Sequence, residues 1–327
     1  MTKRIPPGDA NDLCAALDLG TNNCRLLIAR RRGEGFHVVD AFSRIVRLGE
    51  GIAATGRLSE PAIERTLAAL RVCAQKLARS GTRNGRYVAT EACRRAANCG
   101  AFLDRVQRET GIAIEIISSG EEARLVVAGC APLLDRAVPH ALVFDIGGGS
   151  TELVWLALGA GPDPALLGYR SVPHGVVTLA DRYGGRAVTQ GIYEAMVSEV
   201  AEALAPFEAE HRIGPLVARG HVELLGSSGT VTTLAGVHLD LPRYNRAAVD
   251  GLSMAFGEIE KVSRSLAAMS YEQRVAHPCI GHDRADLVIS GCAILEAICA
   301  TWPIGRLRVA DRGIREGVLT GLRETRQ

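Results

Sequence analysis

The sequence lacks any long apolar run. No segment of its 327 residues reaches about 18 uninterrupted apolar residues, the length that a membrane-spanning helix needs. Residues 1–12 are polar and contain Pro6-Pro7-Gly8, so they do not resemble the apolar stretch of a signal peptide. We therefore expect no membrane partner and a cytoplasmic location.

An excess of charge of one sign is also missing. The formal net charge is +2, which gives no electrostatic argument for a nucleic-acid partner. Lysine is scarce, with only Lys3, Lys76 and Lys261 among 38 basic residues. Arginine binds phosphate oxygens bidentately, so some of the arginines are candidates for anion binding, while a general preference for arginine explains most of them.

Paired cysteine motifs are absent. The nine cysteines form an odd set without a CxxC pair, which excludes an obvious disulfide framework or zinc site. We expect them to be reduced and mostly buried, as small apolar residues of a cytosolic protein.

What the sequence does contain is one pattern written twice, in residues 16–22 and 143–151. Each copy has an apolar run, an aspartate (Asp18 or Asp145), one apolar residue, a glycine and small hydroxyl or amide residues, and a second apolar run follows. The pattern predicts two similar hairpins. Glycines let backbone N–H groups approach an anion, and an aspartate at a strand end can hold a metal or orient water. One such turn alone could be only a tight hairpin, but two of them facing a cleft would bind a phosphate chain from both sides.

Strand-like runs alternate with helical stretches, which is typical of α/β architecture. Ser59-Glu60-Pro61 predicts a helix start, with an N-cap and a proline in the first turn. The order of elements restarts at Ala141, after a stretch at 131–140 with two prolines. We therefore expect two domains, 1–136 and 137–327. Expected strands include 37–42, 85–90, 112–117, 166–172, 222–226 and 307–310, and expected helices 101–110, 193–207, 258–268 and 285–299.

His277 and His282 suggest a metal site by composition only. Their spacing does not stack two side chains on one helix face, and Pro278 and Gly281 favour a loop.

The two repeated stretches, continued to Arg25 and to Glu152, resemble the phosphate-1 and phosphate-2 motifs of the fold shared by actin, hexokinase and the heat-shock ATPases. More narrowly, they resemble the exopolyphosphatase and guanosine pentaphosphate phosphohydrolase (Ppx/GppA) family, in its short two-domain form. Further segments agree in family order: 46–51, 89–94, 114–125, 226–230, 284–286 and 313–317. The resemblance implies two similar actin-like (ribonuclease H-like) α/β domains with an interdomain cleft. In this superfamily the last helix, here from Ile314, can return to the first domain.

The resemblance also implies the roles of individual residues. It places the catalytic base on Glu122, at a strand end followed by glycine and a helix start, where a side chain can project into a cleft. Glu121 is the next candidate, and both acids could instead simply favour a helix N-terminus. The acids on the magnesium side are Asp145, Glu152 and Asp18, with Mg²⁺ as the cofactor. The candidate substrate-binding residues are Gly20, Thr21, Asn22, Asn23, Arg25, Arg94, Gly147, Gly148, Gly149, Ser150, Gly226, Ser227, Ser228 and Gly229.

The implied activity is hydrolysis of a terminal phosphoanhydride, with electrostatic shielding, a divalent cation and a carboxylate that orients water. Inorganic polyphosphate and guanosine pentaphosphate are the expected substrates, and a homodimer is a possible assembly. Thr21 and Asn23 stand where serines are common in the family, which keeps the donors but alters the detailed contacts. An acetate-kinase-like or sugar-kinase-like phosphotransferase and a non-catalytic alarmone-binding protein are the alternatives. The first is weakened by the match at Glu122, and the second by the presence of all three acids Glu122, Asp145 and Glu152.

Overall fold

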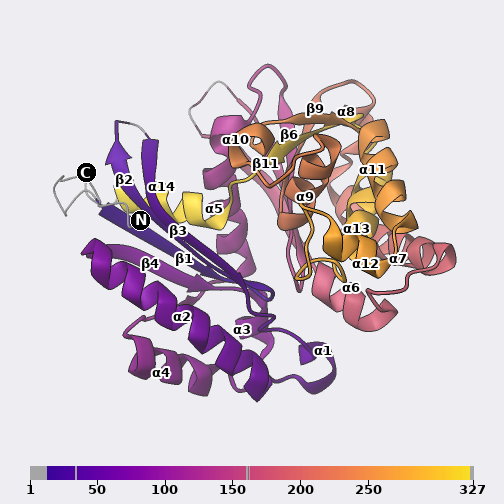
Figure 1. Cartoon of the computed structure of the whole chain (residues 1–327). Coiled ribbons are helices and arrows are strands. Elements are labelled where there is room, and N and C mark those ends of the chain that lie inside the picture. The colour runs from indigo at the N-terminus through magenta and orange to yellow at the C-terminus, as the bar shows by residue number, and fades with distance from the viewer. Residues whose placement is uncertain (1–12, 34, 160, 162, 325–327) are drawn as a thin grey trace. The chain divides into compact units, whose positions relative to one another are not determined.

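The structure, a computed structural model, describes residues 13–33, 35–159, 161 and 163–324, so the polar stretch 1–12 lies outside it. The chain divides into two compact units (Figure 1). The first contains the chain up to Gly129 together with the part from Ile314 onward, and the second is Cys130–Gly313. The expected α/β fold class is confirmed. No helix within the described ranges has the length and apolar character needed to cross a membrane.

The first unit is built on a five-stranded sheet of order β3-β2-β1-β4-β5. The first three strands form an antiparallel meander, and β4 and β5 continue the sheet in parallel with β1. The strands are β1 (Leu13–Leu19), β2 (Asn23–Arg32), β3 (Gly35–Ile45), β4 (Asn84–Ala89) and β5 (Glu115–Ile116), and the helices are α1 (Ile52–Thr55), α2 (Glu60–Ser80), α3 (Glu91–Arg95), α4 (Cys99–Thr110), α5 (Ser119–Cys130) and α14 (Ile314–Glu324).

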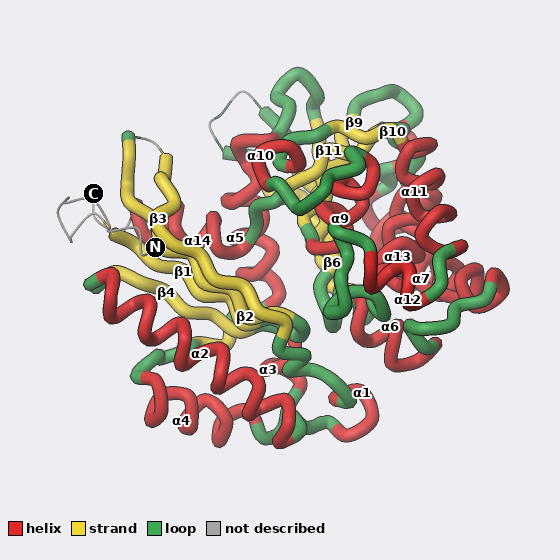
Figure 2. The backbone as a smooth tube through the Cα atoms, in the orientation of Figure 1, coloured by secondary structure: helices red, strands yellow, loops and turns green. Residues whose placement is uncertain are grey.

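Helix α2 follows the expected sequence signals. Ser59 caps it by accepting a hydrogen bond from Ala62 N, Pro61 lies in the first turn, and Gly81 ends it with a left-handed conformation. Helix α2 packs on β2 and β3, and α4 packs on α2 (Figure 2). Leucines of β1 and of α2 meet in one buried cluster that forms the core of this unit.

The final helix α14 completes the first unit. It packs against β1 and β4, and it lies close to α5 at Gly317, where a Cβ atom would be 1.9 Å from Leu125 O. Side chains alternate along a strand, so Cys14 and Ala16 of β1 lie on the face opposite its leucines. Both are fully buried, so β1 is covered on both faces.

The second unit repeats the strand plan of the first. Its sheet has the order β10-β11-β9-β6-β7-β8, in which β8-β7-β6-β9-β11 corresponds to β3-β2-β1-β4-β5 with the same parallel and antiparallel pairings. Even the register shift between the second and third strands recurs, at Ile28/Ala29 and at Trp155/Leu156. The strands are β6 (His140–Ile146), β7 (Thr151–Ala157), β8 (Ala165–Val172), β9 (Val222–Ser227), β10 (Ser253–Ala255) and β11 (Arg306–Ala310). The expectation of two similar domains is therefore confirmed.

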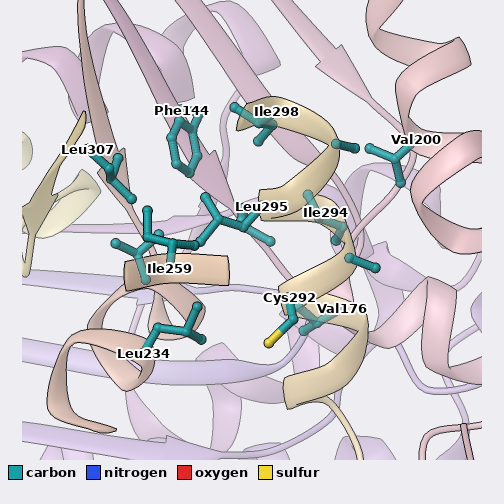
Figure 3. Packing of buried hydrophobic residues seen from close by; sticks show 14 of the residues in the cluster. Phe144, Val176, Val200, Leu234, Ile259, Cys292, Ile294, Leu295, Ile298 and Leu307 are labelled. Carbon is teal, nitrogen blue, oxygen red and sulfur yellow. The ribbon is translucent and has the colours of Figure 1, made fainter. Parts of the chain in front are cut away.

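The core of the second unit is centred on α13 (Val288–Thr301), a helix that is apolar on all sides and packs on α7, α6, α11 and α9 (Figure 3). Phe144 and Leu307 from the sheet lie in the same buried cluster. The other helices of this unit are α6 (Val176–Tyr183), α7 (Gln190–His211), α8 (Gly214–Val217), α9 (Gly229–His238), α10 (Arg246–Val249), α11 (Phe256–Ala268) and α12 (Tyr271–Ala276), with a 3-10 turn at Ala131–Leu133.

Two expectations need correction. The units separate between Gly129 and Cys130 rather than near residue 136, because α5 continues to Cys130 and the segment after it is fixed to the second unit, where Asp135 N donates to Glu223 Oε1 at 2.6 Å. The strand expected at 112–117 is reduced to Glu115–Ile116. His277 and His282 lie in a loop, as expected.

Candidate functional site

The two repeated stretches fold into hairpin turns that close in the same way. In the first, Gly20 N donates to Asn23 O at 2.9 Å, and in the second Gly147 N donates to Ser150 O at 2.9 Å. Gly20, Thr21, Asn22 and Asn23 thus correspond in position to Gly147, Gly148, Gly149 and Ser150. Each turn joins the first two strands of its sheet, at the end where the preceding aspartate lies.

The carbonyl groups of the first turn point back into its own unit. Thr21 O accepts from Gly49 N at 2.9 Å, and Asn22 O accepts from Val46 N at 2.8 Å and Arg47 N at 3.0 Å. The N–H groups of Thr21 and Asn22 donate to no acceptor among the described residues of this unit. A turn with engaged carbonyls and available N–H groups is an anion-binding concavity.

The second turn is held in the same manner by the start of α6. Gly147 O accepts from Val176 N at 3.0 Å, and Gly148 O accepts from Val177 N at 2.8 Å. Within the described part of their own unit, the N–H groups of Gly148 and Gly149 have no acceptor either. The N-terminus of α6 therefore binds the turn itself and leaves the N–H groups of the turn for a ligand.

Two glycines that the sequence analysis did not single out as site residues make this support possible. A Cβ atom at Gly49 would lie 2.3 Å from Thr21 Cγ2, and one at Gly175 would lie 2.4 Å from Gly148 C. A side chain at Gly175 would displace the backbone of the second turn, and one at Gly49 would displace the Thr21 side chain of the first. The signal for Gly175 is that it follows a strand and a proline, but only the fold shows what it packs against.

Asp18 and Arg25 face each other across the first hairpin. Burial raises the pKa of Asp18 above its ordinary value, while Arg25 and Arg315 lower it by a smaller amount. Arg315 comes from α14, so the final helix contributes a cation next to the first turn. Asp18 Oδ1 is buried without a hydrogen-bond partner in the described part of the chain.

Asp145 and Glu152 face each other across the second hairpin. Glu152 is buried, and its Oε1 accepts from Ser150 Oγ at 2.6 Å and from Ser171 Oγ at 2.9 Å. Glu152 therefore fixes the hydroxyl of the last turn residue. Whether it also contacts a metal ion remains a prediction from the sequence.

Arg94, which is partly buried, and the buried Glu122 form an ion pair in the first unit. Arg94 Nη1 lies 2.7 Å from Glu122 Oε2 and also donates to Ile117 O at 3.0 Å, while Nε and Nη2 of Arg94 donate to Glu91 Oε2 at 3.2 and 2.9 Å. Burial lowers the pKa of Arg94, but Glu122 and Glu91 raise it by more, so the net pKa is above its ordinary value. Four of the five N–H donors of Arg94 are engaged within the unit. Arg94, which the sequence analysis names as a substrate-binding residue, thus holds the candidate base Glu122 in place.

The third glycine loop lies between β9 and α9. Gly226 is required for packing, since a Cβ atom there would lie 2.4 Å from Phe144 Cζ. Ser227 Oγ donates to Arg312 O at 2.5 Å, and Ser228 Oγ caps α9 by accepting from Val231 N at 2.9 Å. The side chains of this loop therefore stabilise the loop itself, and Gly229 is the first residue of α9.

The described residues contain no cluster of three or more His, Cys, Asp or Glu side chains that could hold a metal ion. Magnesium, however, is usually held in proteins by one or two carboxylates, several waters and the phosphates of a substrate. The buried Asp18 Oδ1 that has no partner fits such an ion, because a cation or its water would satisfy it.

Comparison with known proteins places the chain in one phosphatase family. The model of the Ppx/GppA phosphatase family matches residues 27–325, which begin after the first turn and include the second. An exopolyphosphatase-like protein of known structure is 30% identical, with a TM-score of 0.86 over 96% of this chain and 99% of that one. The Ppx/GppA enzyme of Aquifex aeolicus is 29% identical, with a TM-score of 0.76 over 94% of this chain and 99% of that one. An exopolyphosphatase from Cytophaga hutchinsonii shares the fold, at 24% identity and a TM-score of 0.85 over 95% and 98% of the two chains.

Proposed function

The chain belongs to the Ppx/GppA phosphatase family, and we propose that it releases the terminal phosphate of inorganic polyphosphate or of guanosine pentaphosphate by attack of water. The observation that carries this proposal is the pair of hairpin turns, each with its carbonyls bound by its own unit. In each turn, N–H groups without an acceptor in the described part of their own unit suit the oxygens of a phosphate chain, whose negative charge increases in the transition state.

Glu122 is the proposed base. It is buried, and Arg94 fixes one of its carboxylate oxygens, so its orientation is defined before a substrate binds. A base in this position would orient the attacking water and accept its proton as the bond to the terminal phosphorus forms and the anhydride oxygen leaves. The bridging oxygen that leaves remains on the shortened substrate, where it becomes an oxygen of the new terminal phosphate.

Arg25 and the N–H groups of the two turns are the proposed contacts for the phosphate oxygens. Asp18, Asp145 and Glu152 are the proposed residues that would hold Mg²⁺. When bound, the ion would neutralise charge on the phosphates. Support for this comes from the buried oxygen of Asp18 and from the opposed carboxylates of the second hairpin.

Polyphosphate and guanosine pentaphosphate share the terminal phosphoanhydride, so both fit the same turns. The experiment that tests the function is a phosphate-release panel with magnesium over long polyphosphate, triphosphate and guanosine pentaphosphate. A parallel assay would offer ATP together with acetate or a sugar as acceptor. We expect phosphate release to exceed transfer, whereas transfer exceeding hydrolysis would overturn the proposal in favour of a kinase.

A further inference from the structure

The consecutive acids Glu121 and Glu122 belong to two similar triads of charged side chains within the first unit. Arg86 of β4 binds Glu121, and it is bound in turn by Glu115. Arg94 of α3 binds Glu122, and it is bound in turn by Glu91. In each triad, an arginine therefore lies between two glutamates.

Glu91 determines which part of the Arg94 guanidinium reaches Glu122. One oxygen of Glu91, Oε2, accepts from both Nε and Nη2 and so occupies one edge of the planar group. Only Nη1 is then directed to Glu122 Oε2 and Ile117 O. Without Glu91, this edge loses its acceptor, so the guanidinium is free to turn and to exchange between single and bidentate pairing with Glu122.

Glu91 also shares the charge of Arg94. A guanidinium that lies between two carboxylates stabilises each of them less than it would stabilise one alone. A base that is bound too strongly to a cation is a weaker base, which lowers its efficiency in proton transfer.

We infer that Glu91 is a positioning residue, which acts through Arg94 to keep Glu122 in its orientation and only singly hydrogen-bonded to the guanidinium. This inference rests on the proposed role of Glu122 as the base.

The triad of Arg86, Glu121 and Glu115 provides a matched control for the triad that contains Glu122. The side chains of Arg94, Glu122 and Glu91 are 19%, 7% and 18% exposed, whereas those of Arg86, Glu121 and Glu115 are 31%, 36% and 52% exposed. Water screens the charges of the Arg86 triad more strongly, so loss of Glu115 perturbs Glu121 little.

The test compares Glu91→Ala, Glu91→Gln and Glu115→Ala in phosphate release, alone and combined with Arg94→Ala. We expect Glu91→Ala to lower kcat by roughly tenfold with an unchanged KM, as for a group that acts only on the chemical step. Glu91→Gln, which keeps an acceptor for Arg94, loses less. In the Arg94→Ala background Glu91→Ala has no further effect, because Glu91 acts through Arg94, whereas a purely structural role gives additive losses. Glu115→Ala retains the wild-type kcat.

A measurement independent of activity separates this inference from the proposed function. Relaxation of the arginine Nε–H groups in nitrogen-15 NMR reports the rigidity of each guanidinium. Glu91→Ala should make Arg94 Nε–H mobile and leave that of Arg86 rigid, and Glu115→Ala should do the reverse. A rigid Arg94 in Glu91→Ala, or a mobile one with unchanged kcat, would overturn the inference. Absence of phosphate release by the wild-type protein would instead contradict the proposed function, and the NMR comparison would still decide whether Glu91 holds Arg94.

Discussion

Asp145 and Glu152 are direct cross-strand partners on β6 and β7, so two carboxylates project from one face of the second hairpin. The corresponding partners in the first hairpin are Asp18 and Arg25, which carry opposite charges. Like charges directly opposite each other on a sheet are unfavourable. Two opposed carboxylates on one hairpin therefore favour a nearby cation.

This relationship predicts the effect of removing either acid on the magnesium requirement. We expect Asp145→Asn and Glu152→Gln each to raise the magnesium concentration needed for half-maximal phosphate release, because the acids supply the negative charge that holds the ion against its own hydration. Glu223→Gln, on the neighbouring strand β9, is the control and should leave the titration unchanged. Magnesium titrations identical to wild type in both variants would assign Asp145 and Glu152 to purely structural roles.

Replacement of the base tests the chemistry. Glu122→Gln should lower kcat by roughly 10²- to 10⁴-fold, the usual loss for a general base, and change KM only a few-fold. The amide remains a partner for Arg94, so the fold should be retained, which a urea unfolding curve checks. Near-normal turnover in this variant would transfer the role to Glu121.

The support of the second turn can be tested at Gly175. In Gly175→Ala the new methyl group would lie 2.4 Å from Gly148 C and 2.5 Å from Gly148 O, so the turn must move. We expect KM for the phosphate substrate to rise by about tenfold or more, since misplaced N–H groups lose their hydrogen bonds to the phosphates.

Gly191→Ala is the matched control for that substitution. Gly191 lies in the first turn of α7 with open space around its Cβ position, so this variant should keep the wild-type KM and should not lower the free energy of unfolding. Equal KM values in Gly175→Ala and Gly191→Ala would show that the second turn does not bind the substrate.

His174, next to Gly175, predicts a pH dependence of stability. Its Nδ1 lies 3.2 Å from Glu199 Oε1, but burial lowers its pKa by more than Glu199 raises it, and Arg182 lowers it further. The unfolded chain therefore binds the proton more readily than the folded one. The stabilisation is complete above the ordinary pKa of about 6.5 and is lost as the pH falls toward the lowered value in the folded protein.

The measurement is the free energy of unfolding of wild type and His174→Gln by urea, between about pH 5 and 8. Wild type should lose more stability than the variant on the acid side of this range. Parallel curves for the two proteins would mean that His174 titrates equally in the folded and unfolded states.

The repeated hairpins, the α/β class and helix α2 could be predicted from the sequence, because they depend on local signals such as the glycine turns and the cap at Ser59. The strand predicted at 112–117 is longer than the observed one. Its residues have β propensity, but only Glu115 and Ile116 pair with β4, and propensity does not show how far a pairing extends. The boundary was placed too late, because a proline-containing stretch can also be fixed to one unit by contacts such as Asp135 with Glu223.

The site was only partly predictable for a similar reason. The family resemblance placed Glu122 and Arg94 among the candidates, but it could not show that the two form an ion pair that also contains Glu91. The direction of a guanidinium depends on partners that are distant in the sequence. The same holds for Gly49 and Gly175, whose importance follows from the backbone that packs against them.

The central claim is attack of water on the terminal phosphorus, and hydrolysis in oxygen-18-labelled water tests it most directly. With magnesium and triphosphate or guanosine pentaphosphate, mass spectrometry of the products should show the label in the released phosphate and none in the shortened product. Glu122→Gln should form the same labelled product much more slowly. Label in the shortened product, or phosphate released without label, would contradict the account.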